Sequence, residues 1–268
     1  LRLAKRYNAL CMSEKKNGVF KCSSLPVDAI VRTVEEAKDA VFVIEWSGEY
    51  NIPGLSKSEM VGCEGTAFAY KDVGLITCDH VLVFSGELTG DHPNKGDHVE
   101  VDFQSSNVTD ATLKVSNATT GESWLAKVVH RDKYYDLALI QFDLPKSPVH
   151  HYFIGMNQPI QLSEKGFLIG YPNHSAGKAA NFLEEKILNR YPRFALDRFE
   201  ITGAGSIRQG NSGGPFVNER YQVAGVAQQG ATQSSSNDEC LCITMLDKWL
   251  SEWKAASPSE DTPSSQNI

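Results

Sequence analysis

The chain has 268 residues, of which 41% are hydrophobic and 9% aromatic, so it can bury the core of one large domain or of two modest barrels or sandwiches that share a cleft. A formal net charge of -7 disfavours a general nucleic-acid or anionic-membrane surface. No apolar run approaches the roughly 20 residues of a membrane span, so we expect a soluble protein.

The first part of the chain differs from the rest. Residues 1–24 are basic and mixed, which is compatible with the end of an upstream domain. The chain begins with Leu and shows no signal peptide, so we expect a piece of a longer protein or a processed product, in the cytoplasm. The stretch SLPVDAIVRTVEEAK has Pro26 near its start and apolar residues at helical spacing, which predicts a helix.

From residue 40 onward, short β-branched and aromatic runs alternate with turn residues. Eleven or so such runs, among them AVFVIEW, GTAFAY and GFLIGY, have almost no helix between them, which indicates an all-β sandwich or pair of barrels. Near the end, LDKWLSEWKAA predicts an amphipathic helix that packs on the body. The polar tail 255–268 is expected to be disordered.

Three short segments contain candidate catalytic side chains. Ser212 lies in IRQGNSGGPF among glycines, which permit unusual dihedrals and close approach of backbone. His80 ends the run GLITCDH, and Asp136 heads the run DLALIQF. A histidine or an aspartate at the end of a strand is, by itself, more often structural than catalytic, and a glycine-rich segment can be a simple surface turn.

Together, however, LITCDHVL, YDLALIQF and GNSGGPF occur in the order of the histidine, aspartate and nucleophile motifs of trypsin-like (chymotrypsin-fold) serine peptidases, which they resemble. The chain is most similar to bacterial HtrA-like and related intracellular trypsin-like domains, over roughly residues 28–250. The resemblance implies a peptidase domain at 25–254 with two six-stranded antiparallel β-barrels, roughly 40–145 and 155–247, a short N-terminal helix and a C-terminal helix.

The resemblance also implies a mechanism, that of a serine endopeptidase. Ser212 is expected to be the nucleophile, His80 its general base, and Asp136 the residue that orients the imidazole. The backbone N–H groups of Gly210 and Ser212 are expected to form the oxyanion hole. No cofactor or metal is expected, because the other histidines carry no motif and the six cysteines lack zinc-ligand spacing.

Two departures from the secreted digestive enzymes are informative. Those enzymes have an aspartate immediately before the nucleophile that pairs with a new N-terminal ammonium, whereas this chain has Asn211. We therefore predict that no N-terminal cleavage is needed for activation. Val81 stands where the secreted relatives have a cysteine, which favours free thiols and a reducing compartment, although disulfides stay open.

The resemblance places substrate-binding residues at Ser206, Gln228, Gly230 and Cys240. Ser206 is expected at the base of the primary pocket, Gly230 in its wall and Cys240 on its far side. The segment from Gln228 to Gly230 is expected to pair with the substrate backbone. A neutral, open pocket predicts an apolar P1 residue, the residue before the cleaved bond, but Asp238 and Glu239 lie close enough in sequence to reverse that preference.

Two further hypotheses stay open. The domain can be an inactive trypsin-like binding module, although all three motif residues are present. Alternatively, it can be the protease module of a larger regulated protein, for example in bacterial defence or quality control. The expected partners are a protein or peptide substrate and an upstream domain or regulatory partner, with no membrane and no direct nucleic-acid binding by the peptidase domain.

Overall fold

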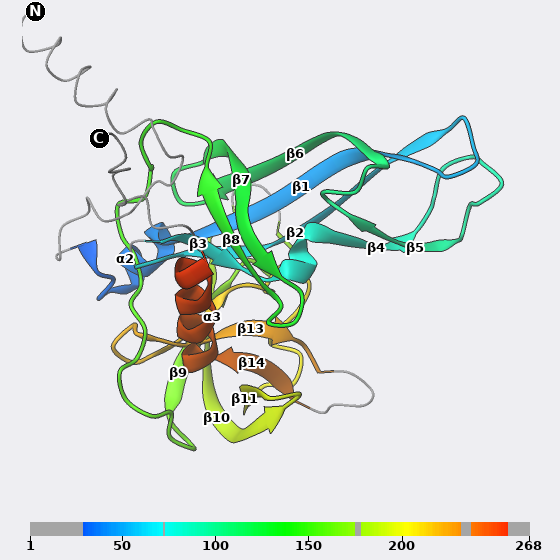
Figure 1. Cartoon of the computed structure of the whole chain (residues 1–268). Coiled ribbons are helices and arrows are strands. Elements are labelled where there is room, and N and C mark those ends of the chain that lie inside the picture. Colours follow the sequence, from blue (N-terminus) through cyan, green and yellow to red (C-terminus); the bar gives the residue numbers. More distant parts are fainter. Residues whose placement is uncertain (1–28, 72, 175–177, 232–236, 257–268) are drawn as a thin grey trace, which may run out of the picture.

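The structure is a computed structural model that describes residues 29–71, 73–174, 178–231 and 237–256. It contains two closed six-stranded barrels with the strand orders β1-β2-β3-β8-β7-β6 and β10-β11-β14-β13-β12-β9. Every pairing in the two barrels is antiparallel. Figure 1 shows the first barrel above the second. The predicted all-β fold with two barrels, a short helix near the N-terminus and a C-terminal helix is confirmed.

The first barrel consists of six strands, and a hairpin projects from it. They are β1 (Val41–Asn51), β2 (Ser58–Tyr70), β3 (Gly74–Thr77), β6 (Val108–Asn117), β7 (Glu122–Asp132) and β8 (Leu137–Phe142). A 3₁₀ turn, η4 (Asp79–Leu82), and the hairpin β4 (Val83–Glu87) and β5 (His98–Asp102) lie between β3 and β6.

The second barrel follows after a connecting segment of 22 residues, 143–164. Its strands are β9 (Lys165–Gly170), β10 (Asn181–Arg193), β11 (Leu196–Ile201), β12 (Pro215–Asn218), β13 (Val223–Gln229) and β14 (Asp238–Cys242). The charged strand β10 has no strand-like pattern in the sequence. It forms a strand because both of its edges are paired, to β9 and to β11.

One core spans the interface between the barrels. All six residues of β8 are buried, and the same cluster includes Val217, Val226 and Leu241 from the second barrel. A smaller cluster around Phe199 and Phe216 fills the second barrel itself. Because packed interiors resist deformation, the shared core fixes the position of one barrel relative to the other.

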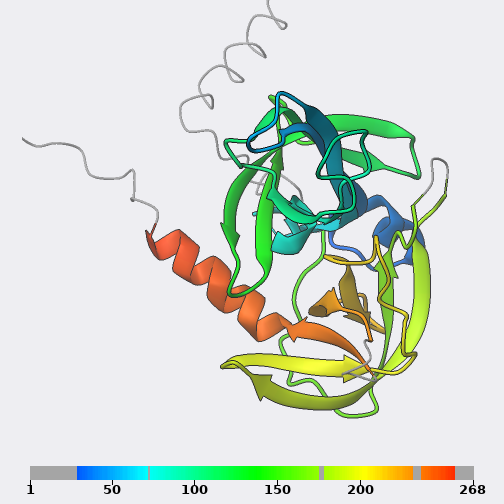
Figure 2. The same cartoon turned by 90° about the vertical axis from the view of Figure 1, so that its right-hand side faces the viewer.

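The helix α3 (Ile243–Ala256) joins the two barrels from one side, as Figure 2 shows. It continues directly from β14, and its Trp249 stacks on His130 of β7 with 5.1 Å between ring centroids. Its Asp247 accepts hydrogen bonds from Tyr70 (2.9 Å) and Lys71 (2.7 Å) of the first barrel. Among the described residues, no helix has the length and apolar character needed to cross a membrane.

The N-terminal helix is shorter than the sequence pattern predicts. Helix α2 runs from Val34 to Asp39 and begins at a capping box in which Thr33 and Glu36 exchange hydrogen bonds. The preceding Val31 is extended, because its N–H donates to the carbonyl of Tyr152 at 3.0 Å. Pro26 and Val27 lie outside the described residues. The apolar spacing over 30–34 therefore reflects burial of an extended segment as well as a helix.

Candidate active site

His80 and Asp136 meet at the edge of the first barrel. His80 lies in η4, just after β3, and Asp136 lies just before β8. Strands β3 and β8 are hydrogen-bonded neighbours, so their adjoining ends bring the two residues together. The His80 Nδ1 lies 2.8 Å from Asp136 Oδ2 and 3.0 Å from Oδ1, and the backbone N–H of His80 also donates to Oδ1 at 2.9 Å. The carboxylate therefore orients both the ring and the backbone of the histidine.

The segment that carries His80 is held by a buried ion-pair network. Asp79 is 3% exposed and accepts a hydrogen bond from Arg131 Nε at 2.5 Å, while Arg131 also donates to Asp102 at 2.8 Å. Buried charges need such partners. This network fixes the turn immediately before the histidine. The sequence motifs did not predict these ion pairs.

The pKa of His80 reflects opposing effects. Burial lowers the pKa, whereas the hydrogen bond and negative charge of Asp136, together with the charge of Asp79, raise it; on balance the pKa lies above the usual 6.5. The side chain still has 44% of its surface exposed, so its outer edge is accessible to a reactant.

Cys78 lies behind this pair. Ligand atoms of Cys78, His80 and Asp136 lie within 4.8 Å of one another, a grouping that can hold a metal ion. The Cys78 thiol, however, is fully buried and donates to the carbonyl of Ala227 at 3.2 Å. Burial raises its pKa well above the usual value, which opposes the thiolate form that a metal requires.

Ser212 belongs to the second barrel, and its backbone contacts the first barrel at Gly65 and Thr66 of β2. The Thr66 N–H donates to the Ser212 carbonyl at 2.9 Å. A Cβ added to Gly65 would lie 2.7 Å from Val81 and 3.1 Å from the Ser212 carbonyl, so a glycine is required at this contact. Val81 follows His80 in the chain, and the contact therefore brings the serine and the histidine segment to the same place.

Gly210 has a backbone conformation that favours glycine. Its φ is +92°, and a Cβ there would lie 2.3 Å from the Tyr171 carbonyl. The Gln209 carbonyl accepts a hydrogen bond from Asn173 N–H at 2.9 Å. Because peptide C=O and N–H point in opposite directions, the Gly210 N–H points away from that loop. In the described part of the chain, neither this N–H nor that of Ser212 has a hydrogen-bond partner.

The buried hydroxyl of Thr66, on β2, ties this turn to its surroundings. It donates to the Gly210 carbonyl at 2.6 Å and accepts from the Tyr171 N–H at 3.0 Å. Thr66 is fully buried. The sequence did not predict that Thr66 links the Gly210 turn to Tyr171, because this contact forms only where the two barrels meet.

The expected substrate-binding residues occupy different environments. Gln228 is 6% exposed, and its Nε2 donates to the carbonyls of Tyr135 (2.8 Å) and Asp136 (2.9 Å). The Gln228 side chain therefore holds the backbone at Asp136 in place. Cys240 is fully buried in the core of the second barrel. Ser206 donates to Glu185, and Gly230 lies against the Ile207 carbonyl. Their contact with substrate stays a prediction.

The acidic residues considered for the pocket also have partners. Glu239 is buried and ion-paired with Arg193 at 2.9 Å. Asp238 is fully buried and accepts hydrogen bonds from three backbone N–H groups.

Asn211, which precedes the serine, is 1% exposed and donates to the Ser206 carbonyl at 2.6 Å. The expectation that the enzyme is active without N-terminal cleavage stays a prediction. The four described cysteines, Cys63, Cys78, Cys240 and Cys242, are free thiols.

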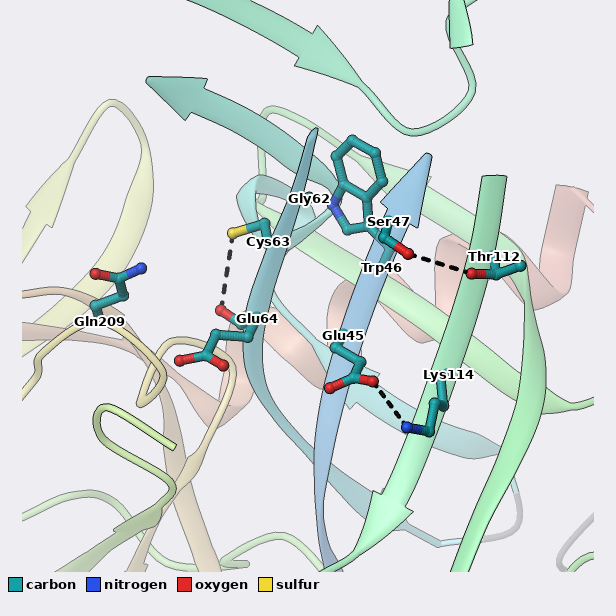
Figure 3. Close-up of a pocket in the computed structure, with 9 residues that line it drawn as sticks. All are labelled: Glu45, Trp46, Ser47, Gly62, Cys63, Glu64, Thr112, Lys114 and Gln209. Carbon is teal, nitrogen blue, oxygen red and sulfur yellow. Dashed lines mark hydrogen bonds and ion pairs between the residues drawn. The ribbon is translucent and has the colours of Figure 1, made fainter. Parts of the chain in front are cut away.

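A groove of about 350 Å³ continues from this site along the outside of the first barrel. Figure 3 shows that its wall comes from β1, β2 and β6, with Gln209 facing it from the second barrel. Glu45 and Lys114 form an ion pair of 2.9 Å in this wall. Gln209 precedes Gly210 in the chain, so the lining of this groove includes the residue next to the Gly210 turn.

The chain belongs to the family of trypsin-like peptidase domains, which it matches over residues 65–226. Membership of this family identifies it as a serine endopeptidase. No curated protein matches the chain.

Several solved structures share the fold. The active form of the Rv3671c protease from M. tuberculosis is 18% identical, with 91% of this chain and 94% of that chain covered and a TM-score of 0.55. The HtrA-type protease AlgW with a tripeptide is 18% identical, with 82% and 61% covered and a TM-score of 0.56. The serine endoprotease from Yersinia pestis is 18% identical, with 83% and 65% covered and a TM-score of 0.55.

Proposed function

We propose that this serine endopeptidase cleaves peptide bonds through His80, Asp136 and Ser212. The observation that carries the proposal is the meeting of three distant segments. The His80–Asp136 pair is followed by Val81, which lies against Gly65 at the point that the Ser212 carbonyl also approaches. Among the described residues, the N–H groups of Gly210 and Ser212 have no hydrogen-bond partner. This is the set of groups that acyl transfer by a serine requires.

The chemistry follows from these positions. The neutral imidazole of His80 accepts the proton of the Ser212 hydroxyl as Oγ attacks the substrate carbonyl carbon. Asp136 accepts the Nδ1–H of His80, which fixes the tautomer and stabilises the imidazolium. The carbonyl oxygen becomes an oxyanion that accepts hydrogen bonds from the N–H groups of Gly210 and Ser212. The imidazolium then gives its proton to the leaving amine, and an acyl-enzyme remains on Ser212.

Hydrolysis of the acyl-enzyme repeats the same steps with water. His80 removes a proton from the water as its oxygen attacks the ester carbon, and it returns the proton to Ser212 Oγ as the ester bond breaks. We propose that the groove lined by Gln209 accommodates the part of the substrate that follows the cleaved bond. A polypeptide that extends on both sides of the bond fits this arrangement, as an endopeptidase requires.

Replacing Ser212 tests the proposal. Ser212→Ala is expected to lower hydrolysis of a mixed fluorogenic peptide library by at least about 10⁴-fold, because the nucleophile is lost. Ser123→Ala, an exposed serine on β7 whose hydroxyl contacts Ser116, is the matched control and is expected to retain activity. Equal thermal unfolding of both variants shows that the fold is intact. Full activity of Ser212→Ala contradicts the proposal, and an inactive wild type favours the binding-module hypothesis.

We also propose that the peptidase is a module of a larger regulated protein, as in bacterial defence or quality control. The support is compositional, because the basic segment 1–24 differs from the peptidase body. Reading the genomic frame upstream of Leu1 tests this, and a stop codon with a start site immediately upstream contradicts it.

A further inference from the structure

Each residue of η4, the turn that carries His80, is bonded to another part of the chain. The Val81 carbonyl accepts the Nε1–H of Trp46 on β1 at 3.0 Å, and the Leu82 carbonyl accepts the N–H of Phe103 at 2.9 Å. His80 itself meets the carboxylate that precedes β8. These contacts fix the backbone and the ring, whereas the first residue of the turn is held by an ion pair.

The ion pair at the start of η4 is buried. The Asp79 side chain is only 5% exposed, and its Oδ1 accepts a hydrogen bond from Arg131 Nε at 2.5 Å. Among the described residues, no other side chain bonds to this carboxylate. A buried charge is costly unless a partner compensates it, so Asp79 depends on Arg131.

Arg131 also binds a second carboxylate. Its Nη1 donates to Asp102 Oδ1 at 2.8 Å. Asp102 is the last residue of β5 and is paired with Val83, the first residue of β4, so it lies at the base of the hairpin that projects in Figure 1. Because η4 leads directly into β4, one guanidinium joins β7, the turn that carries His80 and the base of the hairpin.

The chemistry of this position is specific to arginine. A guanidinium has N–H donors in a fixed plane and can bind two carboxylates at once, whereas an ammonium is a point charge on a flexible stem. The Arg131 side chain is 14% exposed, so solvent screens its contacts little. The nearby Lys133 is 75% exposed, and its Nζ lies 3.7 Å from Asp102. An exposed contact of that length cannot substitute for the buried pair.

His80 lies among charges of both signs. The titratable and charged groups around it are Cys78 after β3, Asp79 in η4, Asp102 at the end of β5, Arg131 and Lys133 in and after β7, Asp136 before β8 and, from the second barrel, Arg198 of β11, whose charge acts on Cys78. Burial lowers the pKa of His80, and Asp136 and then Asp79 raise it. Because Arg131 compensates the charge of Asp79, Asp136 remains the main charge that His80 senses.

We propose that Arg131 is a positioning residue of the reaction. Through Asp79 and Asp102 it holds η4 against the base of the hairpin and compensates the charge beside the histidine, so that His80 keeps the orientation and the basicity that Asp136 gives it. The proposal rests on the proposed function, because it requires His80 to act as the base. Arg131 acts only through the two carboxylates.

Two substitutions that break the buried pair from opposite sides test the proposal, in the whole chain and with enzyme concentration set by fluorophosphonate titration. In Arg131→Met the network becomes more negative, so the midpoint at which kcat/KM rises with pH is expected to increase by at least about 0.5 pH unit. Because the carboxylates also lose their anchor, kcat is expected to fall at least about fivefold with KM little changed. In Asp79→Asn the network becomes less negative, so the midpoint is expected to decrease by at least about 0.5 pH unit.

A conservative variant and a matched control accompany these measurements. Arg131→Lys keeps the charge without the planar fork, and it is expected to return the midpoint to within about 0.2 pH unit of the wild type while recovering only part of kcat. Arg190→Met breaks an arginine–aspartate pair of the second barrel, between β10 and Asp197 of β11, and is expected to leave both values unchanged. Thermal unfolding of each variant reports its stability separately.

The direction of the two shifts decides the outcome. A merely structural role would lower the unfolding temperature without changing the basicity of His80, so midpoints that stay at the wild-type value, or that move in the same direction, overturn the proposal. If Arg131→Met does not fold, Asp79→Asn decides alone, because its amide oxygen can still accept from Arg131, and an unchanged or raised midpoint overturns the proposal. A wild type that reacts with no fluorophosphonate and cleaves no peptide overturns the proposed function itself, and this role with it.

Discussion

The two barrels contribute to the candidate site in different ways. The first barrel holds side chains: His80 and Asp136 lie at the ends of two neighbouring strands and bond to each other. The second barrel presents backbone: Gly210 and Gly213 take positive φ angles around Ser212, and the N–H groups of Gly210 and Ser212 have no partner among the residues that the structure describes. Acid–base chemistry needs an oriented ring, whereas an oxyanion needs donors held in place, and in the proposed mechanism the first barrel provides the ring and the second the donors.

The largest expected effect comes from disturbing the first barrel's pair. Asp136→Asn keeps the shape of the side chain but removes its charge and favours the wrong imidazole tautomer, so kcat is expected to fall by about 10⁴-fold. Steady-state kinetics on a peptide substrate measure this. A fall of less than tenfold would show that the first barrel does not supply the acid–base pair.

The second barrel is tested by Gly210→Ala. The added Cβ would lie 2.3 Å from the Tyr171 carbonyl, and a φ of +92° is strained for alanine. The turn is expected to shift and remove one oxyanion donor, which lowers kcat by about 10²- to 10³-fold. Gly96→Ala, in the connection between β4 and β5, is the matched control, because Gly96 also has positive φ but no atom within 4 Å of an added Cβ. Equal losses in both variants would mean that strain alone, and not the oxyanion donor, explains the effect.

A smaller effect is expected where the barrels meet beneath Asp136. Gln228→Met removes the two hydrogen bonds to the carbonyls of Tyr135 and Asp136, and Asp136 has a φ of +52° that needs support. We expect kcat to fall by roughly 10- to 100-fold through misplacement of the carboxylate, with KM little changed. A change confined to KM would instead favour direct contact between Gln228 and substrate.

The smallest expected effect is a shift in pH dependence. The carboxylate of Asp136 helps to raise the pKa of His80, and only the neutral imidazole can act as base. kcat/KM is therefore expected to rise with pH around a midpoint above 6.5, and that midpoint is expected to fall in Asp136→Asn. For stability the sign is opposite: the contribution of the protonated histidine is present at low pH and is lost as pH rises through its folded-state pKa. An unchanged midpoint in the variant would contradict this assignment.

The sequence predicted local features well and distant contacts poorly. The motifs around His80, Asp136 and Ser212 are short. The apolar runs predicted an all-β sandwich or pair of barrels, and the resemblance carried by those motifs specified two six-stranded barrels. The predicted helix in SLPVDAIVRTVEEAK was too long within the described residues, because apolar spacing does not separate a helix from a buried extended segment such as the one in which Val31 bonds to Tyr152. The contacts of Asp238, Glu185 and Thr66 were beyond prediction, since each depends on strands that meet only in the folded barrels.

The most direct test of the central claim is where, and how fast, a fluorophosphonate reacts. We predict a single adduct that peptide mapping by mass spectrometry locates at Ser212. The rate of labelling is expected to fall at least about 10³-fold in His80→Ala, because the first barrel supplies the base for the second barrel's nucleophile. An adduct at another residue, or labelling of Ser212 at the wild-type rate without His80, would contradict the account.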